Sequence, residues 1–222
     1  MSWCKTPSAC DYHDRDPFGN RRGFVNRFPL RPTGNKSDAT MRTPADHALD
    51  ELLVLGCQDG DARALDTLVQ RWHAPLLRHA WHLTRQPDAA ADVTQEAWLA
   101  IVRGIRRLHD PALFRTWAYR IVTHKCADWT RRRRLHRRFD RTNDAIADEQ
   151  PPLIVARDEA RQLHDAMRSL GSDQRAILSL RYWEQMSIAQ IAAVLDVPDG
   201  TVKSRLSHAR NDLRTILERS MT

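Results

Sequence analysis

The sequence predicts an all-α protein built from two small helical domains that are joined by a flexible linker. Apolar residues recur three and four positions apart over most of residues 46–219, which is the spacing of helices with one buried face. No stretch alternates apolar and polar residues as a half-buried strand would. Residues 137–154 are polar, contain Pro151–Pro152 and lack this period, so we expect them to form the linker.

Residues 1–44 precede the first patterned segment. They are rich in Arg, Asn, Gly, Pro and Asp and show no sustained period, so we expect a disordered N-terminal extension. Met41 stands just before the first helix and is a second candidate start. A start codon assigned too far upstream and a functional tail both remain open.

The first helical domain is expected over residues 46–136. Gly60 and Asp61 supply a break and an N-cap after its first helix. A long apolar stripe then extends from Leu65 to Trp81, and Pro87–Asp88 begins the next helix. A short loop at 108–111 precedes the last helix, which ends in an arginine-rich run at 131–138.

The second helical domain, residues 155–219, ends in a predicted helix-turn-helix. Ser187 is a plausible N-cap for the first helix, and Pro198 and Gly200 interrupt the apolar pattern where a turn is needed. The side chains that open the second helix could reach base edges and phosphates in a major groove. They are Thr201, Lys203, Ser204 and Arg205. DNA is therefore the leading candidate partner.

The run at 131–138 holds six arginines in eight positions. Two or three arginines would complement the carbonyl end of a helix, but six exceed that need, so we favour contact with phosphates. Trp117 is expected to pack in the core. For Tyr119 and Trp129, core packing and stacking on unpaired bases both remain open.

The segment 88–98 is acidic in an otherwise basic chain. Asp88 and Asp92 suit the positive end of a helix. Gln95 and Glu96 lie beyond that explanation, and a polar face beside Trp98 is also typical of a protein–protein contact.

The composition excludes several functional classes. The net charge is +7 and only four of the 35 basic residues are lysines, which favours a polyanionic partner. The four cysteines form no metal or disulfide pattern and are expected to be free thiols. His73, His79 and His82 lack the further ligands of a metal site, and no catalytic motif is present. We therefore expect no cofactor, no metal, no enzymatic activity and no small-molecule substrate. No membrane span or signal peptide is predicted, so a cytoplasmic location is expected.

Both domains resemble parts of one bacterial family, the sigma factors of the extracytoplasmic function group in the sigma-seventy family. Residues 60–65 resemble the opening helix of region 2, 88–99 its polymerase-binding helix, and 114–122 its minus-ten reader. Residues 170–175, 191–192 and 200–210 resemble region 4, which reads the minus-thirty-five element. The order of these motifs across a linker is more specific than either set alone.

The resemblance implies three groups of functional residues. The residues implied in binding core polymerase are Asp92, Gln95, Glu96 and Trp98. Those implied at the minus-ten element are Leu108, His109, Trp117, Tyr119, His124, Arg131, Arg132, Arg133 and Arg134. Those implied at the minus-thirty-five element are Thr201, Lys203, Ser204, Arg205, Ser207 and His208. His124 stands where the family usually has asparagine, and Ser207 and His208 are shorter than its usual residues.

The implied function is a dissociable promoter-specificity subunit. Its implied partners are core RNA polymerase, promoter DNA and an anti-sigma factor, with no insertion into a membrane. A stand-alone helix-turn-helix regulator is the alternative, but such a protein needs neither the 88–99 motif nor the arginine run. An RNA-binding or protein-interaction module would explain the charge but not residues 200–205.

Overall fold

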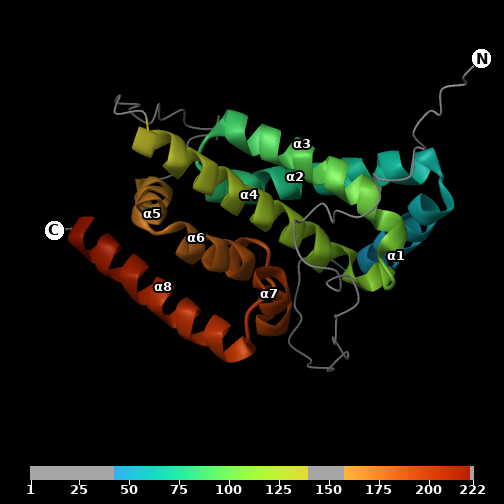
Figure 1. Ribbon diagram of the computed structural model, residues 1–222. Helices are drawn as coiled ribbons and strands as arrows, with labels where there is room; N and C mark the ends of the chain where they lie inside the picture. Colours follow the sequence, from blue (N-terminus) through green and yellow to red (C-terminus); the bar gives the residue numbers. More distant parts are fainter. Residues whose placement is uncertain (1–42, 140–157, 221–222) are drawn as a thin grey trace, which may run out of the picture. The chain divides into compact units, whose positions relative to one another are not determined.

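The computed structural model describes residues 43–139 and 158–220, in which every regular element is a helix and none is a strand (Figure 1). The predicted all-α class is therefore confirmed. The predicted extension falls almost entirely in residues 1–42, and most of the predicted linker falls in 140–157. Both stretches lie outside the described residues.

The first set of helices consists of four long helices with two short 3-10 turns between the third and the fourth. They are α1 (Pro44–Asp59), α2 (Ala62–Thr84), α3 (Pro87–Gly104), η2 (Ile105–Arg107), η3 (Pro111–Leu113) and α4 (Phe114–Phe139). Gly60 ends α1 with a φ of 90°, and the Asp61 carboxylate accepts a hydrogen bond from the Arg63 N–H at 2.8 Å. The predicted break and cap are thus confirmed, since left-handed φ values favour glycine and Asp is a preferred N-cap.

The core of this set is aromatic at its centre. Trp72 of α2 is 1% exposed and packs edge-to-face on Phe114 and Tyr119 of α4, with ring centroids 5.5 and 6.2 Å apart. Such edge-to-face pairs add to the free energy already gained by burying apolar surface. Leu68, Leu76 and Ile101 are also fully buried. The apolar stripe predicted for α2 therefore faces the core.

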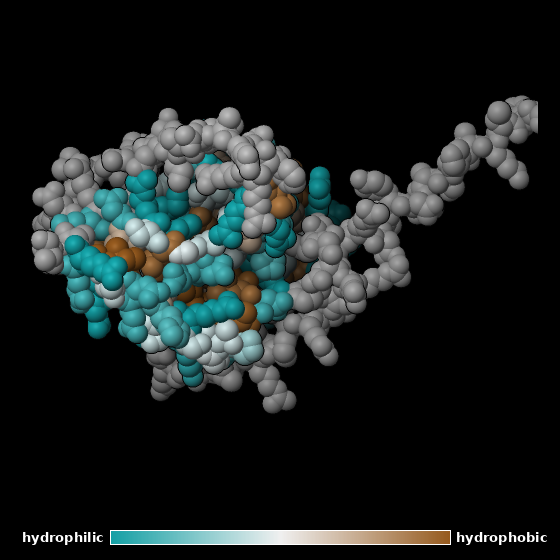
Figure 2. Space-filling view, turned by 60° about the vertical axis from the view of Figure 1, so that its left-hand side comes forward, coloured by the Kyte–Doolittle hydropathy of each residue, from teal (hydrophilic) through white to brown (hydrophobic). Residues whose placement is uncertain are grey.

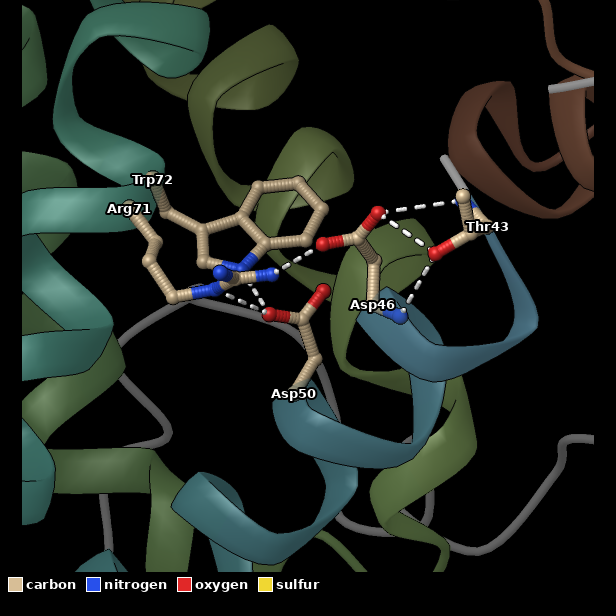
Figure 3. A network of polar contacts seen from close by, with 5 residues as sticks. All are labelled: Thr43, Asp46, Asp50, Arg71 and Trp72. Carbon is tan, nitrogen blue, oxygen red and sulfur yellow. Dashed lines mark hydrogen bonds and ion pairs between the residues drawn. The ribbon is translucent and has the colours of Figure 1, made fainter. Parts of the chain in front are cut away.

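A polar network joins the start of α1 to the middle of α2, as Figure 3 shows. Arg71 donates to Asp46 at 3.1 Å and to Asp50 at 3.0 Å, and the Trp72 indole N–H donates to Asp50 at 3.1 Å. The Thr43 backbone N–H and hydroxyl, together with Arg71, lower the pKa of Asp46 to about 2. These contacts satisfy the polar edge of Trp72 while its ring is buried.

The second set of helices contains the predicted helix-turn-helix. It consists of α5 (Asp158–Ser169), α6 (Ser172–Leu178), the π-helix η4 (Ser179–Trp183), α7 (Ile188–Leu195) and α8 (Asp199–Ser220). Ser187 caps α7 as predicted, and its hydroxyl accepts from the Gln190 N–H at 3.2 Å. The turn itself differs from the prediction, because Asp196 supplies the left-handed residue (φ 56°) and Gly200 lies inside α8.

The described surface is largely hydrophilic, with separate hydrophobic patches on the face that Figure 2 presents. No helix among residues 43–139 and 158–220 is both long and apolar enough to span a membrane.

Candidate nucleic-acid interface

The exposed side of α8 carries the residues predicted to contact DNA. Val202, Leu206 and Ala209 are buried, which turns the intervening positions outward. Lys203, Ser204, Arg205, Ser207 and His208 are all exposed, while Thr201 is half-buried. We call these five exposed residues the recognition face. The structure therefore brings most of this predicted set together on one helix side that is free to meet a large partner.

The predicted polymerase-binding residues on α3 differ in their exposure to solvent. Asp92 and Gln95 are exposed, and Glu96 is half-buried and forms an ion pair with Lys125 of α4 at 3.0 Å. Trp98 is a correction, because it is 9% exposed and belongs to the core. Residues four positions apart share a face of a helix, and Trp98 shares its face with Thr94, which is fully buried.

The two residues implied at the minus-ten element in the predicted 108–111 loop also differ in exposure. His109 is exposed, but Leu108 is 9% exposed and belongs to the core, so it offers no open contact in this conformation. Gln58 of α1 donates to the carbonyls of Ile105 and Leu108 at 3.0 and 2.7 Å. Asp110 accepts from the Ala112 N–H at 3.0 Å. The loop is therefore held at both ends with His109 at its tip.

The aromatic residues of α4 differ in exposure. Trp117 is half-buried, and its ring lies so close to Gly104 that a Cβ there would come within 2.9 Å. Tyr119 is only 1% exposed, so of the two alternatives core packing is the correct one in this conformation. Trp129 is half-buried, with the Arg133 guanidinium 5.2 Å from its ring centroid.

The arginine run is only partly open to solvent. Arg131, Arg132 and Arg134 are exposed and Arg133 is half-buried. Arg131 pairs with Asp128 at 3.3 Å, and Arg132 lies 3.9 Å from Glu96 of α3. Exposed pairs of this kind contribute little stability, so these arginines can exchange a carboxylate for a phosphate at small cost.

Tyr119 is buried between Trp72 and His79 of α2 and the second set of helices, which packs over α2 and α4. Glu184, directly after η4, is 5% exposed and receives three groups from the first set. The Tyr119 hydroxyl and Arg78 donate to its carboxylate, Arg78 at 3.3 Å, and Arg115 donates to its backbone carbonyl. Burial and the Glu184 carboxylate raise the pKa of Tyr119, so the phenol remains a proton donor.

His79 of α2 lies in the same contact and is fully buried. Its Nε2 is 3.0 Å from the Thr123 hydroxyl and its Nδ1 is 3.1 Å from the Ser179 hydroxyl. The Thr123 hydroxyl donates its proton to the Tyr119 carbonyl, so it can only accept a hydrogen bond from His79 Nε2–H. This assigns the neutral tautomer of His79 that is protonated on Nε2, whose Nδ1 accepts from the Ser179 hydroxyl. Burial, then His82 and Arg78, lower the pKa of His79 to about 3.

Arg120 extends this contact to the helix-turn-helix. It donates to the Ala193 carbonyl at 3.3 Å and lies 3.4 Å from the Asp196 carboxylate. Burial lowers the pKa of His124, one turn further along α4, with Arg120 adding to the effect. We call this polar contact the seam, comprising Arg78, His79, Arg115, Tyr119, Arg120, Thr123, Ser179, Glu184, Ala193 and Asp196.

Sequence reasoning missed the seam. One signal was present, since Glu184 lies four residues after Leu180 and seven after Ile177, both of which are buried. A carboxylate in step with a buried face requires a partner, but the sequence does not say which one. Within residues 43–139 and 158–220, no three His, Cys, Asp or Glu side chains gather as metal ligands would.

Two family models match the chain in the order of its two helical sets. The model described as Sigma-70 region 2 matches residues 68–136, and the model described as Sigma-70, region 4 matches residues 160–213. Together they cover the recognition face, the α3 residues and the first four arginines of the arginine run.

Individual sigma factors are also similar to this chain in sequence and in structure. An RNA polymerase sigma-H factor of Pseudomonas aeruginosa is 32% identical over 181 residues, which cover 76% of this chain and 94% of that protein. The ECF RNA polymerase sigma factor SigM of Mycobacterium tuberculosis is 32% identical over 163 residues, covering 71% and 79%. Among solved structures, CnrH in complex with the cytosolic domain of CnrY is 25% identical, has a TM-score of 0.59 and covers 77% of this chain and 98% of that chain.

Proposed function

Because the chain belongs to the sigma-70 family of transcription initiation factors, in its extracytoplasmic function group, we propose that it binds core RNA polymerase and selects promoters by their minus-ten and minus-thirty-five elements. In this role it catalyses nothing itself, and the polymerase forms the phosphodiester bonds. It would act in the cytoplasm, where the polymerase is.

The recognition face of α8 is the observation that carries the proposal for the minus-thirty-five element. Five polar or basic side chains stand outward on the second helix of a helix-turn-helix, whose family model matches here. The start of such a helix enters the major groove, where Arg and Lys read guanine and Ser and His reach other edges or phosphates.

Contact with core polymerase is assigned to the outer side of α3. Asp92 and Gln95 are exposed there, and Glu96 adds a second carboxylate. Trp98 is left out of this set because its indole belongs to the core.

Minus-ten recognition is assigned to His109, Trp117, His124 and the arginines 131–134. Tyr119 joins them only after the seam has opened, because Glu184 and η4 cover it in the closed arrangement. Promoter melting would therefore require that the two helical sets separate. CnrH was solved with the cytosolic domain of CnrY, and we expect an anti-sigma partner for this chain as well.

The decisive experiment is transcription in vitro with purified core polymerase on a promoter library, with and without the full chain. We expect promoter-dependent transcripts only when the chain is present. Arg205→Ala should lower use of promoters with a matched minus-thirty-five element by roughly 5–150-fold, because one groove contact contributes about 1–3 kcal/mol.

Arg214→Ala is the matched control, since Arg214 is exposed on the same helix beyond the recognition face. It should transcribe like the parent chain, and both variants should bind core polymerase normally. Failure of the parent chain to bind core polymerase would overturn the proposal. Loss of core binding in Arg205→Ala alone would overturn the assignment of roles.

A further inference from the structure

A cavity of about 210 Å³ lies where the ends of α2 and α4 meet α5 and α6. Five of its ten lining residues are arginines, and no Asp or Glu is among the described residues that line it. The arginines are Arg85, Arg133, Arg134, Arg168 and Arg175. They come from both helical sets, so the cavity exists only while the two sets are packed together.

Arg175 is fixed in place at the floor of this cavity. One of its terminal nitrogens donates to the Leu83 carbonyl at 3.2 Å and the other donates to the Leu170 carbonyl. Its Nε is buried and donates to no acceptor among the described residues. The fold therefore holds the positive charge of Arg175 in one place beside the cavity, where it favours an anion.

The positive charges in the cavity also act on one another. Burial and the neighbouring Arg134 lower the pKa of Arg175. Arg168 has the Asp165 carboxylate at 3.8 Å, and Asp165 does not line the cavity. An anion between these arginines would relieve their repulsion.

We propose that this cavity is a binding site for a small phosphorylated anion, the chemistry shared by inorganic pyrophosphate and the phosphate tail of a nucleotide. Arginine forks match phosphate oxygens in pairs, and charge-assisted hydrogen bonds of this kind are strong. The volume is below the roughly 300–1,000 Å³ of pockets that enclose drug-sized ligands. The phosphates therefore fit inside, and any nucleoside would extend out of the cavity.

A nucleic-acid strand fits this site less well than a compact anion. Single strands follow grooves that track many successive phosphates, whereas the arginines here line one small cavity. A ligand bound by both helical sets stabilises their packed arrangement, because it binds that arrangement and not the separated one. The site would thus couple phosphate-bearing metabolites to the closed state. Its existence can be tested without any assay of transcription.

The test is isothermal titration of the full chain at low salt with pyrophosphate, ATP and sulfate, and with a short single-stranded DNA as a separate arm. We expect saturable binding of pyrophosphate or ATP at one site, and at least tenfold weaker binding of sulfate. Binding of both anions identifies the phosphate groups as the recognised part. Binding of ATP alone indicates that the nucleoside also contacts the protein.

Arg168→Ala and Arg85→Ala remove one arginine from each helical set, and each should weaken binding at least tenfold. Arg63→Ala is the control, because Arg63 is exposed at the start of α2 and does not line the cavity. It should bind like the parent chain. Circular dichroism verifies that each variant is folded. If Arg168→Ala is not folded, Arg168→Lys replaces it, because lysine keeps the charge but lacks the forked guanidinium donors.

Three results would overturn the proposal. One is the absence of saturable binding by both pyrophosphate and ATP. Another is a loss of anion affinity in Arg63→Ala as large as in the cavity variants, which would show that only the net charge matters. The third is binding of the single-stranded DNA alone, weakened by Arg168→Ala, which would make the cavity part of a nucleic-acid path.

Discussion

The seam and the recognition face contain the same kinds of charged and polar side chains, but these are buried and paired at the seam and exposed on the recognition face. At the seam, Glu184 and His79 are 5% and 0% exposed, and each polar atom that meets them is supplied by a neighbouring helix. On the recognition face, Lys203, Arg205 and His208 stand in water. Desolvation makes a missing partner costly in the first place and nearly neutral in the second. Charged groups therefore contribute to the stability of the fold at the seam, whereas on the recognition face they are available to bind a partner.

The largest expected effect is at Glu184. Glu184→Ala should lower the free energy of unfolding by about 1–3 kcal/mol, because it leaves the buried Tyr119 hydroxyl without its acceptor and removes the carboxylate that pairs with Arg78. Urea unfolding at pH 7.5 measures the loss. Asp66→Ala is the control, since Asp66 is exposed on α2, and it should change stability by less than about 0.5 kcal/mol.

A double-mutant cycle sharpens this prediction. Tyr119→Phe removes only the hydroxyl that donates to the Glu184 carboxylate. The double variant with Glu184→Gln should therefore lose less free energy of unfolding than the sum of the losses in the two single variants. Strict additivity would show that these groups do not interact in solution, and the contrast with the recognition face would fail.

The pH dependence of stability follows from His79. Its pKa is about 3 in the folded chain and about 6.5 when unfolded, so below pH 6.5 the unfolded chain binds the additional proton. Stability should thus fall as the pH drops from 6.5 toward 3, by about 1.4 kcal/mol at pH 5.5. The lowered pKa of His124 acts in the same direction.

Urea unfolding of the parent chain and of His79→Gln at pH 7.5 and 5.5 measures this contribution. The variant should be less stable at pH 7.5 but should lose less on acidification. Asp46 does not interfere, because its lowered pKa acts only below about pH 4. An equal loss in both proteins would show that His79 is not the group that titrates.

The smallest expected effect lies beside the recognition face. Gly200 is in α8, and a Cβ added there meets no atom within 4 Å, so Gly200→Ala should raise the free energy of unfolding by about 0.5 kcal/mol. Gly60→Ala is its counterpart, because φ is 90° there and the same change should cost about 1 kcal/mol. Thermal or urea unfolding distinguishes the two signs, and a loss at Gly200 would contradict the helical assignment.

The predictions from sequence succeeded where the cause is local. The Asp61 and Ser187 caps depend on residues within one turn, and the outward side of α8 follows from the spacing of Val202 and Leu206. They failed where the partner is distant in sequence. Tyr119 lies 65 residues from Glu184, and Leu108 is fixed by Gln58, 50 residues earlier. The resemblance implied that Trp98 binds polymerase, but its burial depends on how α3 packs on other helices, which the motif alone does not give.

The π-helix η4 gives this segment one residue to spare. The Glu184 N–H bonds to the Ser179 carbonyl at 3.1 Å, five residues back, so this turn holds one residue more than an α-helical turn bonded four residues back. Losing one residue here would let the turn close as an ordinary α-helical turn, with Glu184 still one turn from Ser179. In a regular α-helix, which advances about 100° per residue, the same loss would rotate everything downstream. In a lineage of such chains, this segment could therefore change in length without re-aiming the DNA-reading helices.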